Sequence, residues 1–304
     1  MDITVVLVTF NRLDCLKIAL SKFEEQTLQA KRIIVVNNCS TDGTEEFLAD
    51  WSKSPDSIFQ KIVIKTEKNI GGAGGFYTGL NEAIKYTDTD WIWLSDDDAY
   101  PEVDAFEQLE LGYNKLDSQE ETSVLFSSVV NKSRFDLSHR RLVKKTIKGV
   151  KFINIEENEY RKDKFEVHQG SYVGMLVKVS SLLKAGLTNK DFFIYYDDTE
   201  HTERLRKIGK MYCIPTSRIN HDVNVDNQIS WKNYYGFRNS LILINDIYGK
   251  QFALIEALKR IILFVSPINK KIEKPYKDML FQGIKDGLKS KTGIHEKYKP
   301  GWKP

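Results

Sequence analysis

The sequence predicts an α/β fold in which a mostly parallel, Rossmann-like sheet is flanked by helices and followed by a helical extension. Short runs of β-branched residues alternate with segments of helical spacing through the first half of the chain. The runs are apolar at successive positions, as in strands that are buried on both faces. After about residue 230 the pattern turns helical and aromatic. We therefore expect an α/β domain over residues 1–229 and a basic, helical extension over residues 230–304.

Each element follows from its local pattern. The apolar runs predict strands at 3–10, 32–38, 61–67 and 91–96, and the segments between them predict helices at 13–26, 44–53 and 76–87. A strand, a helix and a further strand form a βαβ unit, whose strands pair in parallel. Three such units in succession predict a parallel sheet.

The second half of the α/β domain is less regular. Residues 124–180 are strand-like and irregular, so we expect the sheet to continue there around a variable loop. Residues 197–209 are expected to form a helix, because acids open the segment, bases follow and Gly209 closes it. A short strand is expected at 211–215.

Composition sets the broad class. The chain has 304 residues, 41% of them hydrophobic and 29% charged, as in an ordinary globular protein. Its three cysteines, Cys15, Cys39 and Cys213, form no disulfide or metal-binding pattern, which favours a reducing, cytosolic compartment. No apolar run is long enough to cross a bilayer, and the N-terminus lacks the features of a signal peptide.

Charge is divided unevenly along the chain. Residues 231–304 hold 15 Lys+Arg and 6 Asp+Glu, a net charge of +9, whereas residues 1–230 carry a net charge of −6. An acidic body with a basic tail indicates that the tail meets an anionic surface. A solvated helical appendage is the alternative.

Polar residues close each predicted strand of the first half. Ligands of parallel sheets bind beyond the carboxyl ends of the strands. We therefore expect one site to gather Thr9, Asn11 and Arg12, Asn37 and Asn38, Asn69, and Asp96 to Asp98.

Three consecutive aspartates, Asp96 to Asp98, end the strand expected at 91–96. Their mutual repulsion has to be offset by a cation or screened by water. Because an extended backbone points alternate side chains the same way, Asp96 and Asp98 can share one hard divalent cation while Asp97 faces elsewhere. Mg²⁺ or Mn²⁺ fits, since such an ion uses few carboxylates and completes its coordination with phosphate oxygens. The alternative is an acidic turn ahead of a helix near Glu102.

The segment NIGGAGGFYTG, residues 69–79, lies between a predicted strand and a predicted helix. Its glycines allow backbone N–H groups to approach a phosphate closely. Tyr77 stands where a dinucleotide motif has its third glycine, and the Gly-Lys-Ser/Thr of a P-loop is absent. An anion site and a flexible loop tip are both compatible with this segment.

Further candidates carry less specific signals. Asp197 and Asp198 open the helix expected at 197–209, where a carboxylate can have a pKa suited to a general base or can simply be an acid of a helix start. Asn37 and Asn38 end a buried strand with donors and acceptors suited to a nucleobase or a ribose. His221, taken alone, is typical of an ordinary surface or core histidine.

The chain resembles inverting glycosyltransferases of family 2, and most closely their bacterial galactofuranosyl- and rhamnosyltransferase branch. Seven motifs occur in the family's order over about residues 3–240: VVLVTFNR, IIVVNNCSTDGT, NIGGAGGF, WLSDDD, FFIYYDDTE with Arg204 after it, PTSRINH and YYGFRN. The resemblance implies a GT-A fold and a nucleotide-sugar donor. It also implies a divalent metal on DxD-type carboxylates and direct displacement with inversion at the anomeric carbon.

Part of the resemblance concerns the nucleotide. Thr9, Phe10 and Arg12 correspond to the loop that contacts the base and the ribose, and Asp97 to a residue beside the ribose and diphosphate. Asn37 stands where many relatives have an aspartate that binds uracil, so uracil and thymine both remain open. The expected nucleotide-binding set is completed by Asn38, Asn69, Gly71 and Gly72.

The rest concerns the reaction. Asp96, Asp98 and His221 match the metal ligands of the galactofuranosyl branch. Asp198 matches the general base, and Asp197 is the first acid of that pair. The base would take the proton of the acceptor hydroxyl while the metal stabilises the leaving diphosphate.

The resemblance favours UDP-galactofuranose as the donor, with dTDP-rhamnose as the alternative, and a lipid-linked bacterial polysaccharide or glycolipid as the acceptor. No nucleic-acid partner is expected. A sugar nucleotidyltransferase would need a glycine loop bearing lysine and arginine near the N-terminus, which VTFNRLDCL lacks. A non-catalytic carbohydrate-binding module would not need two separate pairs of acids.

The extension pairs an apolar helix face with basic residues. The face contains Phe252, Leu254, Ile255, Leu258, Ile261, Ile262 and Phe264, and the bases on or after the helix are Lys259, Arg260, Lys270, Lys271, Lys274 and Lys277. Such a helix can lie in the interface of an anionic membrane. We expect peripheral attachment to the inner face of the cytoplasmic membrane. The alternative is that the face packs on the α/β domain or on a second copy of the chain, as in a homo-oligomer.

Overall fold

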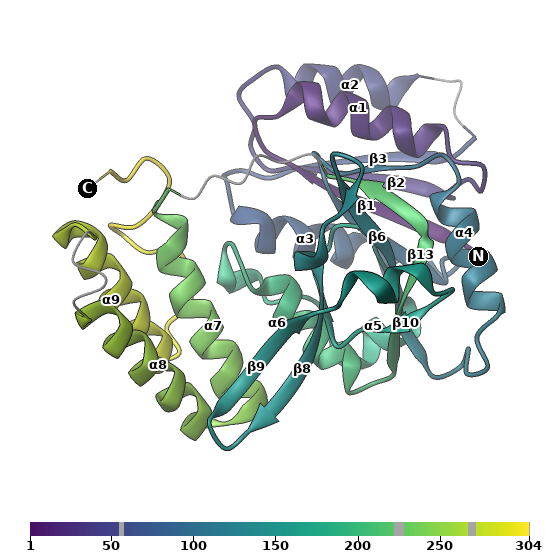
Figure 1. Cartoon of the computed structure of the whole chain (residues 1–304). Helices are drawn as coiled ribbons and strands as arrows, with labels where there is room; N and C mark the ends of the chain where they lie inside the picture. The colour runs from purple at the N-terminus through teal and green to yellow at the C-terminus, as the bar shows by residue number, and fades with distance from the viewer. Residues whose placement is uncertain (55–57, 222–227, 267–271, 304) are drawn as a thin grey trace.

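The computed structural model of the chain describes residues 1–54, 58–221, 228–266 and 272–303. A ten-stranded mixed sheet forms its centre (Figure 1), in the order β10-β13-β6-β12-β4-β1-β2-β3, with β5 beside β13 and β7 beside β6. The strands are β1 (Ile3–Thr9), β2 (Arg32–Asn37), β3 (Gln60–Lys65), β4 (Trp91–Asp96), β5 (Tyr100–Pro101), β6 (Thr122–Asn131), β7 (Arg134–Phe135), β10 (Phe165–Glu166), β12 (Met175–Lys178) and β13 (Lys210–Asn220).

Strands β4, β1, β2 and β3 run parallel, which confirms the predicted βαβ units. Val8 pairs with Asp96, and Thr9 pairs with Asn37. The carboxyl ends of these strands therefore lie level, and the polar residues that close them meet at one edge of the sheet. Beyond β4 the sheet turns mixed, because β12 runs antiparallel to both β4 and β6.

Helices cover both faces of the sheet because successive residues of each strand point to opposite sides. Ile3, Val5 and Leu7 of β1 pack in the core under α1 (Leu13–Glu24), α2 (Thr44–Lys53) and α4 (Ala105–Asn114). Val6 and Val8 pack on the other side, against α3 (Gly71–Ala83), α5 (Val179–Ala185) and α6 (Asp197–Arg206). Figure 1 shows α1 and α2 above the sheet and α3 below it.

The glycine-rich segment is the first part of a helix, so the expectation that α3 starts only at residue 76 is wrong. A Cβ on Gly75 would lie 2.5 Å from Val8 Cγ1, and a Cβ on Gly79 would lie 2.3 Å from Val6 Cγ1. Glycine is needed there because α3 lies directly on β1. The helix begins at Gly71, whose φ of +76° is left-handed and favours glycine.

Strand β13 is longer than the predicted strand 211–215. It pairs in parallel with β6, with an irregularity in register between Ile214 and Arg218, and continues to Asn220. This extension brings His221 to the edge of the sheet at which the aspartates of β4 end.

A second, three-stranded antiparallel sheet lies beside the first. It has the order β11-β8-β9 and contains β8 (Arg140–Thr146), β9 (Gly149–Asn154) and β11 (Gln169–Gly170). The β8–β9 hairpin reaches away from the main sheet towards the C-terminal helices (Figure 1). The described residues of the α/β part also form the 3₁₀ helices η1 (Leu137–His139), η2 (Glu157–Arg161) and η3 (Lys190–Phe192).

The expected helical extension consists of α7 (Lys232–Tyr248), α8 (Lys250–Val265) and α9 (Lys274–Leu288). These helices share an aromatic core that includes Tyr234 and Phe264. Buried Arg238 and Asn239 of α7 donate hydrogen bonds to main-chain oxygens of the α/β part, so α7 packs tightly on it. The domain boundary between residues 229 and 230 stays a prediction.

The apolar face predicted on α8 is partly covered by the chain itself. Ala253, Ala257 and Phe264 are buried, whereas Leu254, Leu258 and Ile262 are 49%, 57% and 58% exposed. Lys270 and Lys271, which the sequence assigns to the same basic surface, lie outside the described residues. Within the described residues, no helix combines the length and the apolar character that a membrane span requires.

Candidate active site

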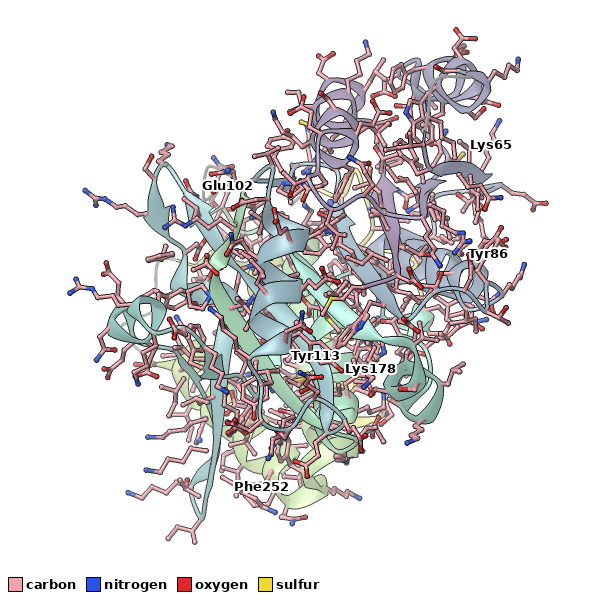
Figure 2. All side chains as sticks on the ribbon, turned by 90° about the vertical axis from the view of Figure 1, so that its right-hand side faces the viewer. Lys65, Tyr86, Glu102, Tyr113, Lys178 and Phe252 are labelled. Atoms are coloured by element: carbon pink, nitrogen blue, oxygen red, sulfur yellow. The ribbon has the colours of Figure 1, made fainter. Side chains whose placement is uncertain are left out.

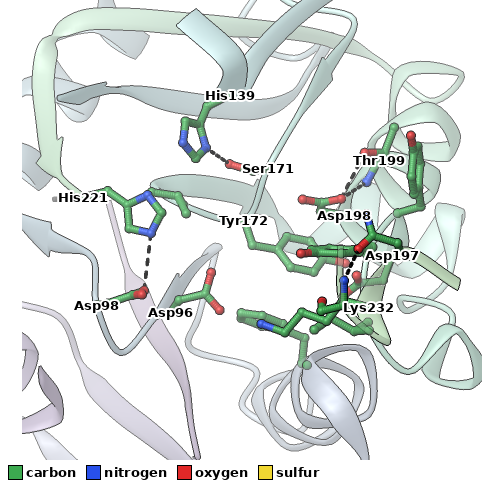
Figure 3. Close-up of a pocket in the computed structure, with 18 of the residues that line it drawn as sticks. Asp96, Asp98, His139, Ser171, Tyr172, Asp197, Asp198, Thr199, His221 and Lys232 are labelled. Atoms are coloured by element: carbon green, nitrogen blue, oxygen red, sulfur yellow. Dashed lines mark hydrogen bonds and ion pairs between the residues drawn. The ribbon is translucent and has the colours of Figure 1, made fainter. Parts of the chain in front are cut away.

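A cavity of about 860 Å³ lies at the carboxyl ends of the parallel strands. It has the size of a site for a small-molecule ligand. Figure 3 shows that both pairs of acids predicted from the sequence, together with His221, face it. The lining therefore brings together five predicted site residues from β4, α6 and the end of β13: Asp96, Asp98, Asp197, Asp198 and His221.

The aspartate triplet alternates as expected. Asp96 and Asp98 line the cavity, whereas Asp97 is buried on the other side and accepts a 2.7 Å hydrogen bond from Thr9 Oγ1. The guanidinium of Arg12 contacts Asp97 Oδ1 at 3.3 Å and forms an ion pair with Asp98. Arg12 is thus a cation of the chain itself that offsets part of the repulsion among the three carboxylates.

His221 is the second positive partner of the triplet. Its Nε2 lies 3.4 Å from Asp98 Oδ1, and its Nδ1 is buried without a hydrogen-bond partner among the described residues. Burial alone would lower the pKa of His221, but the carboxylate of Asp98 outweighs burial and raises it. The imidazole is therefore held against the aspartates by charge.

The donor types around Asp96 and Asp98 suit a divalent metal, since two carboxylates and one imidazole can bind Mn²⁺ or Mg²⁺. The buried Nδ1 of His221, which has no hydrogen-bond partner among the described residues, fits such a role too. The described residues nevertheless contain no group of three or more His, Cys, Asp or Glu side chains close enough together to hold a metal ion. Any metal would therefore need further oxygens, such as those of a diphosphate.

Burial makes the triplet electrostatically costly. It raises the pKa of Asp96 to about 7, with further increases from the charges of Asp98 and Asp97. Burial also raises the pKa of Asp97 to about 6, although Thr9 and Arg12 oppose it. Burial acts to raise the pKa of Asp98 as well, but His221 and Arg12 outweigh it and hold that pKa below its ordinary value.

The second acid pair opens α6, as predicted. Asp197 is buried at 8% exposure, and Asp198 is half-buried and more open to the cavity. Burial raises the pKa of both carboxyls, and hydrogen bonds from the Thr199 N–H and Oγ1 to Asp198 Oδ1 oppose the shift at Asp198. The charge of Asp198 also raises the pKa of Asp96, so the two acid clusters act on each other across the cavity.

The turn before Asp197 is strained, and sequence reasoning missed what holds it. Phe193, Tyr195 and Tyr196 have φ values of 68°, 65° and 69°, which are unfavourable for side chains of this size. The amide nitrogen of Asn239 donates 2.9 Å hydrogen bonds to three carbonyls of this turn, those of Phe192, Ile194 and Tyr195. The motif YYGFRN contains Asn239, but a hydrogen bond to residues 44 to 47 positions earlier is not visible in a local pattern.

Several residues predicted to bind a nucleotide form hydrogen bonds with one another and with the backbone at the N-terminus of α3. Asn38 Nδ2 donates to Asn69 Oδ1 at 3.2 Å and to the Gly71 carbonyl at 3.0 Å, and Asn69 Oδ1 accepts from the Gly71 N–H at 2.8 Å. A Cβ on Gly71 would lie 2.0 Å from the Phe193 carbonyl. Gly72 lines the cavity, and an added Cβ there would meet nothing within 4 Å. Contact of these residues with a nucleotide stays a prediction.

The remaining predicted nucleotide residues lie near the same edge. Phe10 is 39% exposed, and Asn37 is buried with its Oδ1 accepting a 3.0 Å hydrogen bond from the Ser40 N–H. Of the nucleotide set, Arg12 and Gly72 line the cavity. The other members of the set are not among the residues that line it.

The cavity also contains residues that the sequence did not single out. His139 and Arg141 enter at the base of the β8–β9 hairpin. The positive charge of Arg141, and that of His139 when it is protonated, oppose the raised pKa of Asp198. Trp231 and Lys232 enter at the start of α7. The basic character of residues 134–149 was the only local signal for the first pair.

Comparison with known proteins identifies the family. The sequence model described as "Glycosyl transferase family 2" matches residues 4–186, more than half of the chain. The chain belongs to glycosyltransferase family 2. The match confirms the family that the order of the motifs predicted.

Two curated relatives of this family 2 member are galactofuranosyltransferases. The galactofuranosyltransferase GlfT1 of Mycobacterium tuberculosis (strain ATCC 25618 / H37Rv) is 25% identical over 206 residues, which cover 67% of this chain and 64% of that protein. GlfT1 of Mycolicibacterium smegmatis is 33% identical over 96 residues, 32% of this chain and 30% of that protein. The matched part thus spans less than two thirds of the length of either relative.

Solved structures support the GT-A fold. GalNAc-T7 with UDP, GalNAc and Mn²⁺ superposes with a TM-score of 0.64 at 15% identity, covering 94% of this chain and 54% of that one. Staphylococcus aureus TarS 1–349 in complex with UDP superposes with a TM-score of 0.60 at 15% identity, covering 94% and 80%. At this identity the likeness establishes the fold: a mostly parallel central sheet flanked by helices.

Proposed function

We propose that this chain is an inverting, metal-dependent glycosyltransferase that moves galactofuranose from UDP-galactofuranose to a hydroxyl group of a growing bacterial polysaccharide or glycolipid. The observation that carries the proposal is the meeting of two acid clusters in one cavity, Asp96 and Asp98 with His221 on one side and Asp198 on the other. The galactofuranosyltransferase relatives and the UDP-bound structures of the same fold support the choice of donor.

Asp198 is the general base of the proposed reaction. The acceptor hydroxyl is a weak nucleophile until its proton is removed. Both acids of the pair line the cavity, and Asp198 is the less buried of the two. As Asp198 takes this proton, the acceptor oxygen bonds to the anomeric carbon and the bond from that carbon to the diphosphate oxygen breaks. Attack on the face opposite the leaving group inverts the configuration.

Asp96, Asp98 and His221 are the residues that would hold Mn²⁺ or Mg²⁺. When bound, the metal supplies a positive charge that stabilises the diphosphate as it leaves. Arg12 and His221 already neutralise part of the triplet. Their charges keep Asp98 ionised, the form in which it can bind a metal ion. Thr9 fixes Asp97 behind them.

The acceptor we propose is lipid-linked, and the enzyme works at the inner face of the cytoplasmic membrane. The support is the separation of charge along the chain, with a net charge of +9 over residues 231–304. Exposed apolar residues on α8 add to it.

A donor screen tests the proposed function. Nucleotide sugars are added one at a time with Mn²⁺, and the melting temperature is recorded, because a ligand that binds the native state raises it. We expect UDP-galactofuranose to give the largest increase and to release UDP in the presence of the enzyme. A larger increase with dTDP-rhamnose would move the assignment to a rhamnosyltransferase, and the absence of nucleoside diphosphate release from every donor would refute it.

A further inference from the structure

A protruding surface of the protein combines lysines with exposed apolar side chains, and the reaction described above uses none of it. It consists of the outer face and tip of the β8–β9 hairpin, residues 142–153, together with the adjoining exposed side of α8. We call this the hairpin–α8 surface. Figure 2 shows the hairpin reaching below the body of the molecule near Phe252, with side chains that end in nitrogen standing out from it.

The outer face of the hairpin places like charges opposite each other. In the antiparallel pair β8–β9, Lys144 lies opposite Lys151, and Leu142 lies opposite Ile153 on the same face. All four side chains are exposed. Because like charges directly opposite destabilise a strand pair, this arrangement is unfavourable for the isolated chain. An external anion would relieve it.

The tip of the hairpin is apolar and fully open. Ile147 is 92% exposed, the highest value among the large apolar side chains of the described residues, and Lys148 follows it. Within that same part of the chain, neither Lys148 nor Lys144 nor Lys151 forms an ion pair. An isoleucine that projects into water among unneutralised lysines serves no purpose in packing the chain.

The hairpin and α8 form one continuous surface. Lys145 Nζ lies 4.8 Å from the centre of the Phe252 ring, and a Cβ on Gly149 would lie 2.9 Å from Lys259 Nζ. Three of the exposed apolar residues of α8 are spaced four apart and so lie along one side of the helix. They are Leu254, Leu258 and Ile262.

We propose that the hairpin–α8 surface docks the enzyme on an anionic lipid bilayer. Lysine head groups suit lipid phosphates, and the apolar tip and helix stripe suit the boundary between head groups and acyl chains. A second copy of the chain fits poorly, because it would bring the same positive charge against these lysines. An acidic protein surface would neutralise the lysines, but it would not provide the apolar environment that the projecting isoleucine needs.

The same geometry relates the bilayer to the active site, and this step rests on the proposed function. Arg141 at the base of β8 lines the cavity, and Ile147 lies six positions further along the strand and turn. At about 3.3 Å per residue, docking at the tip holds the cavity roughly 20 Å from the membrane surface. A saccharide that is linked to a lipid and already several sugars long spans that distance, whereas a bare lipid phosphate does not.

Co-sedimentation of the full chain with vesicles tests the proposal. The vesicles are phosphatidylcholine alone and phosphatidylcholine mixed with phosphatidylglycerol. We expect binding only to the anionic vesicles. The triple variant K144Q/K148Q/K151Q should bind roughly 100-fold more weakly, from about fivefold per lysine near the surface. Ile147→Ser combined with Leu258→Ser should weaken binding without changing the charge.

Matched controls separate this surface from net charge and general hydrophobicity. K115Q/K184Q/K207Q removes three exposed lysines elsewhere, and Ile58→Ser removes an isoleucine that is 79% exposed on another loop. Both controls should bind like wild type. Equal binding to the two kinds of vesicle, equal losses in the variants and their controls, or no binding by wild type would each overturn the proposal.

The docking proposal and the proposed reaction can be refuted independently of each other. The hairpin variants lie outside the cavity and should keep wild-type release of UDP from UDP-galactofuranose in solution. Asp198→Asn should lose activity and still bind anionic vesicles. If wild type bound anionic vesicles but released no UDP from UDP-galactofuranose, the proposed reaction would be refuted and the docking proposal would not be affected.

Discussion

The side-chain nitrogen of Asn239 lies 2.9 Å from the main-chain oxygen of Tyr195, two residues before Asp197. The same nitrogen reaches two further carbonyls of the turn, and both Asn239 and Asp197 are buried. A helix of the C-terminal extension thus holds the strained backbone from which the acid pair projects. The position of the proposed general base, Asp198, therefore depends on a residue far away in the sequence.

This relationship predicts the effect of Asn239→Ala. Loss of the amide frees a turn with three left-handed residues, so Asp198 should shift and kcat should fall on the order of 10²-fold with little change in donor KM. The melting temperature should also fall, since each lost hydrogen bond costs about 1 kcal/mol. Asn245→Ala, on the same helix but bonded to Asp246, is the matched control. Equal effects of the two variants would contradict the positioning role.

Asp198→Asn keeps the shape of the side chain and removes the carboxylate that we propose as the base. Transfer should fall by roughly 10²- to 10⁴-fold, while donor affinity changes little. Rates and donor affinities are compared with those of wild type. If donor affinity collapsed in parallel, Asp198 would bind the donor or support the fold, and Asp197 would become the better candidate for the base.

The acid limb of the activity profile follows from the same residue. Burial raises the pKa of Asp198, and only the ionised form can accept a proton. Activity should therefore decline as the pH falls through a value above about 3.9, the ordinary pKa of aspartate. A pH profile of kcat measures this directly. An acid limb at or below the ordinary value would contradict the assignment.

Asp96→Ala and Asp98→Ala each remove a carboxylate oxygen that faces the cavity beside His221. Both should abolish transfer and weaken nucleotide binding that depends on metal. Activity is measured across a titration with Mn²⁺, and Asp50→Ala, an exposed aspartate on α2, serves as the control. Near-normal activity of either cavity variant at any metal concentration would show that the metal assignment is wrong.

Asp96→Asn should stabilise the protein in the absence of metal. Burial raises the pKa of Asp96 to about 7, whereas the unfolded state releases this proton near pH 4. The native state therefore binds the proton more tightly, and the free energy of unfolding decreases as the pH rises between these two values. The full shift corresponds to at most about 4 kcal/mol. Melting temperatures in EDTA should therefore rise in the variant at pH 8 and rise less at pH 5. An equal change at both values would show that Asp96 does not titrate differently in the native state.

Sequence patterns predicted the parallel half of the sheet closely, because its strands and helices have their own local signals. They also predicted that Asp96 and Asp98 face one way and Asp97 the other, since this follows from the geometry of a strand. The glycines of α3 misled the prediction, because their role is to let the helix lie on Val6 and Val8. The length of β13 depends on pairing with β6, which no local pattern contains.

The site was only partly predictable for the same reason. Asn38 looks like a free amide in the sequence, yet the structure shows it bonded to Asn69 and Gly71. Arg141 carries no specific motif and reaches the cavity only through the β8–β9 hairpin. Long-range contacts of this kind arise from tertiary packing, which periodicity and spacing do not encode.

The central claim is that one cavity divides the work between two acid clusters, with Asp98 on the side of the donor and Asp198 on the side of the acceptor. Calorimetric titration of UDP-galactofuranose in the presence of Mn²⁺, on wild type, Asp98→Ala and Asp198→Asn, measures this division without an acceptor. The predicted result is that Asp98→Ala loses donor binding and that Asp198→Asn keeps the wild-type affinity. Unchanged binding in Asp98→Ala, or an equal loss in both variants, would contradict the claim.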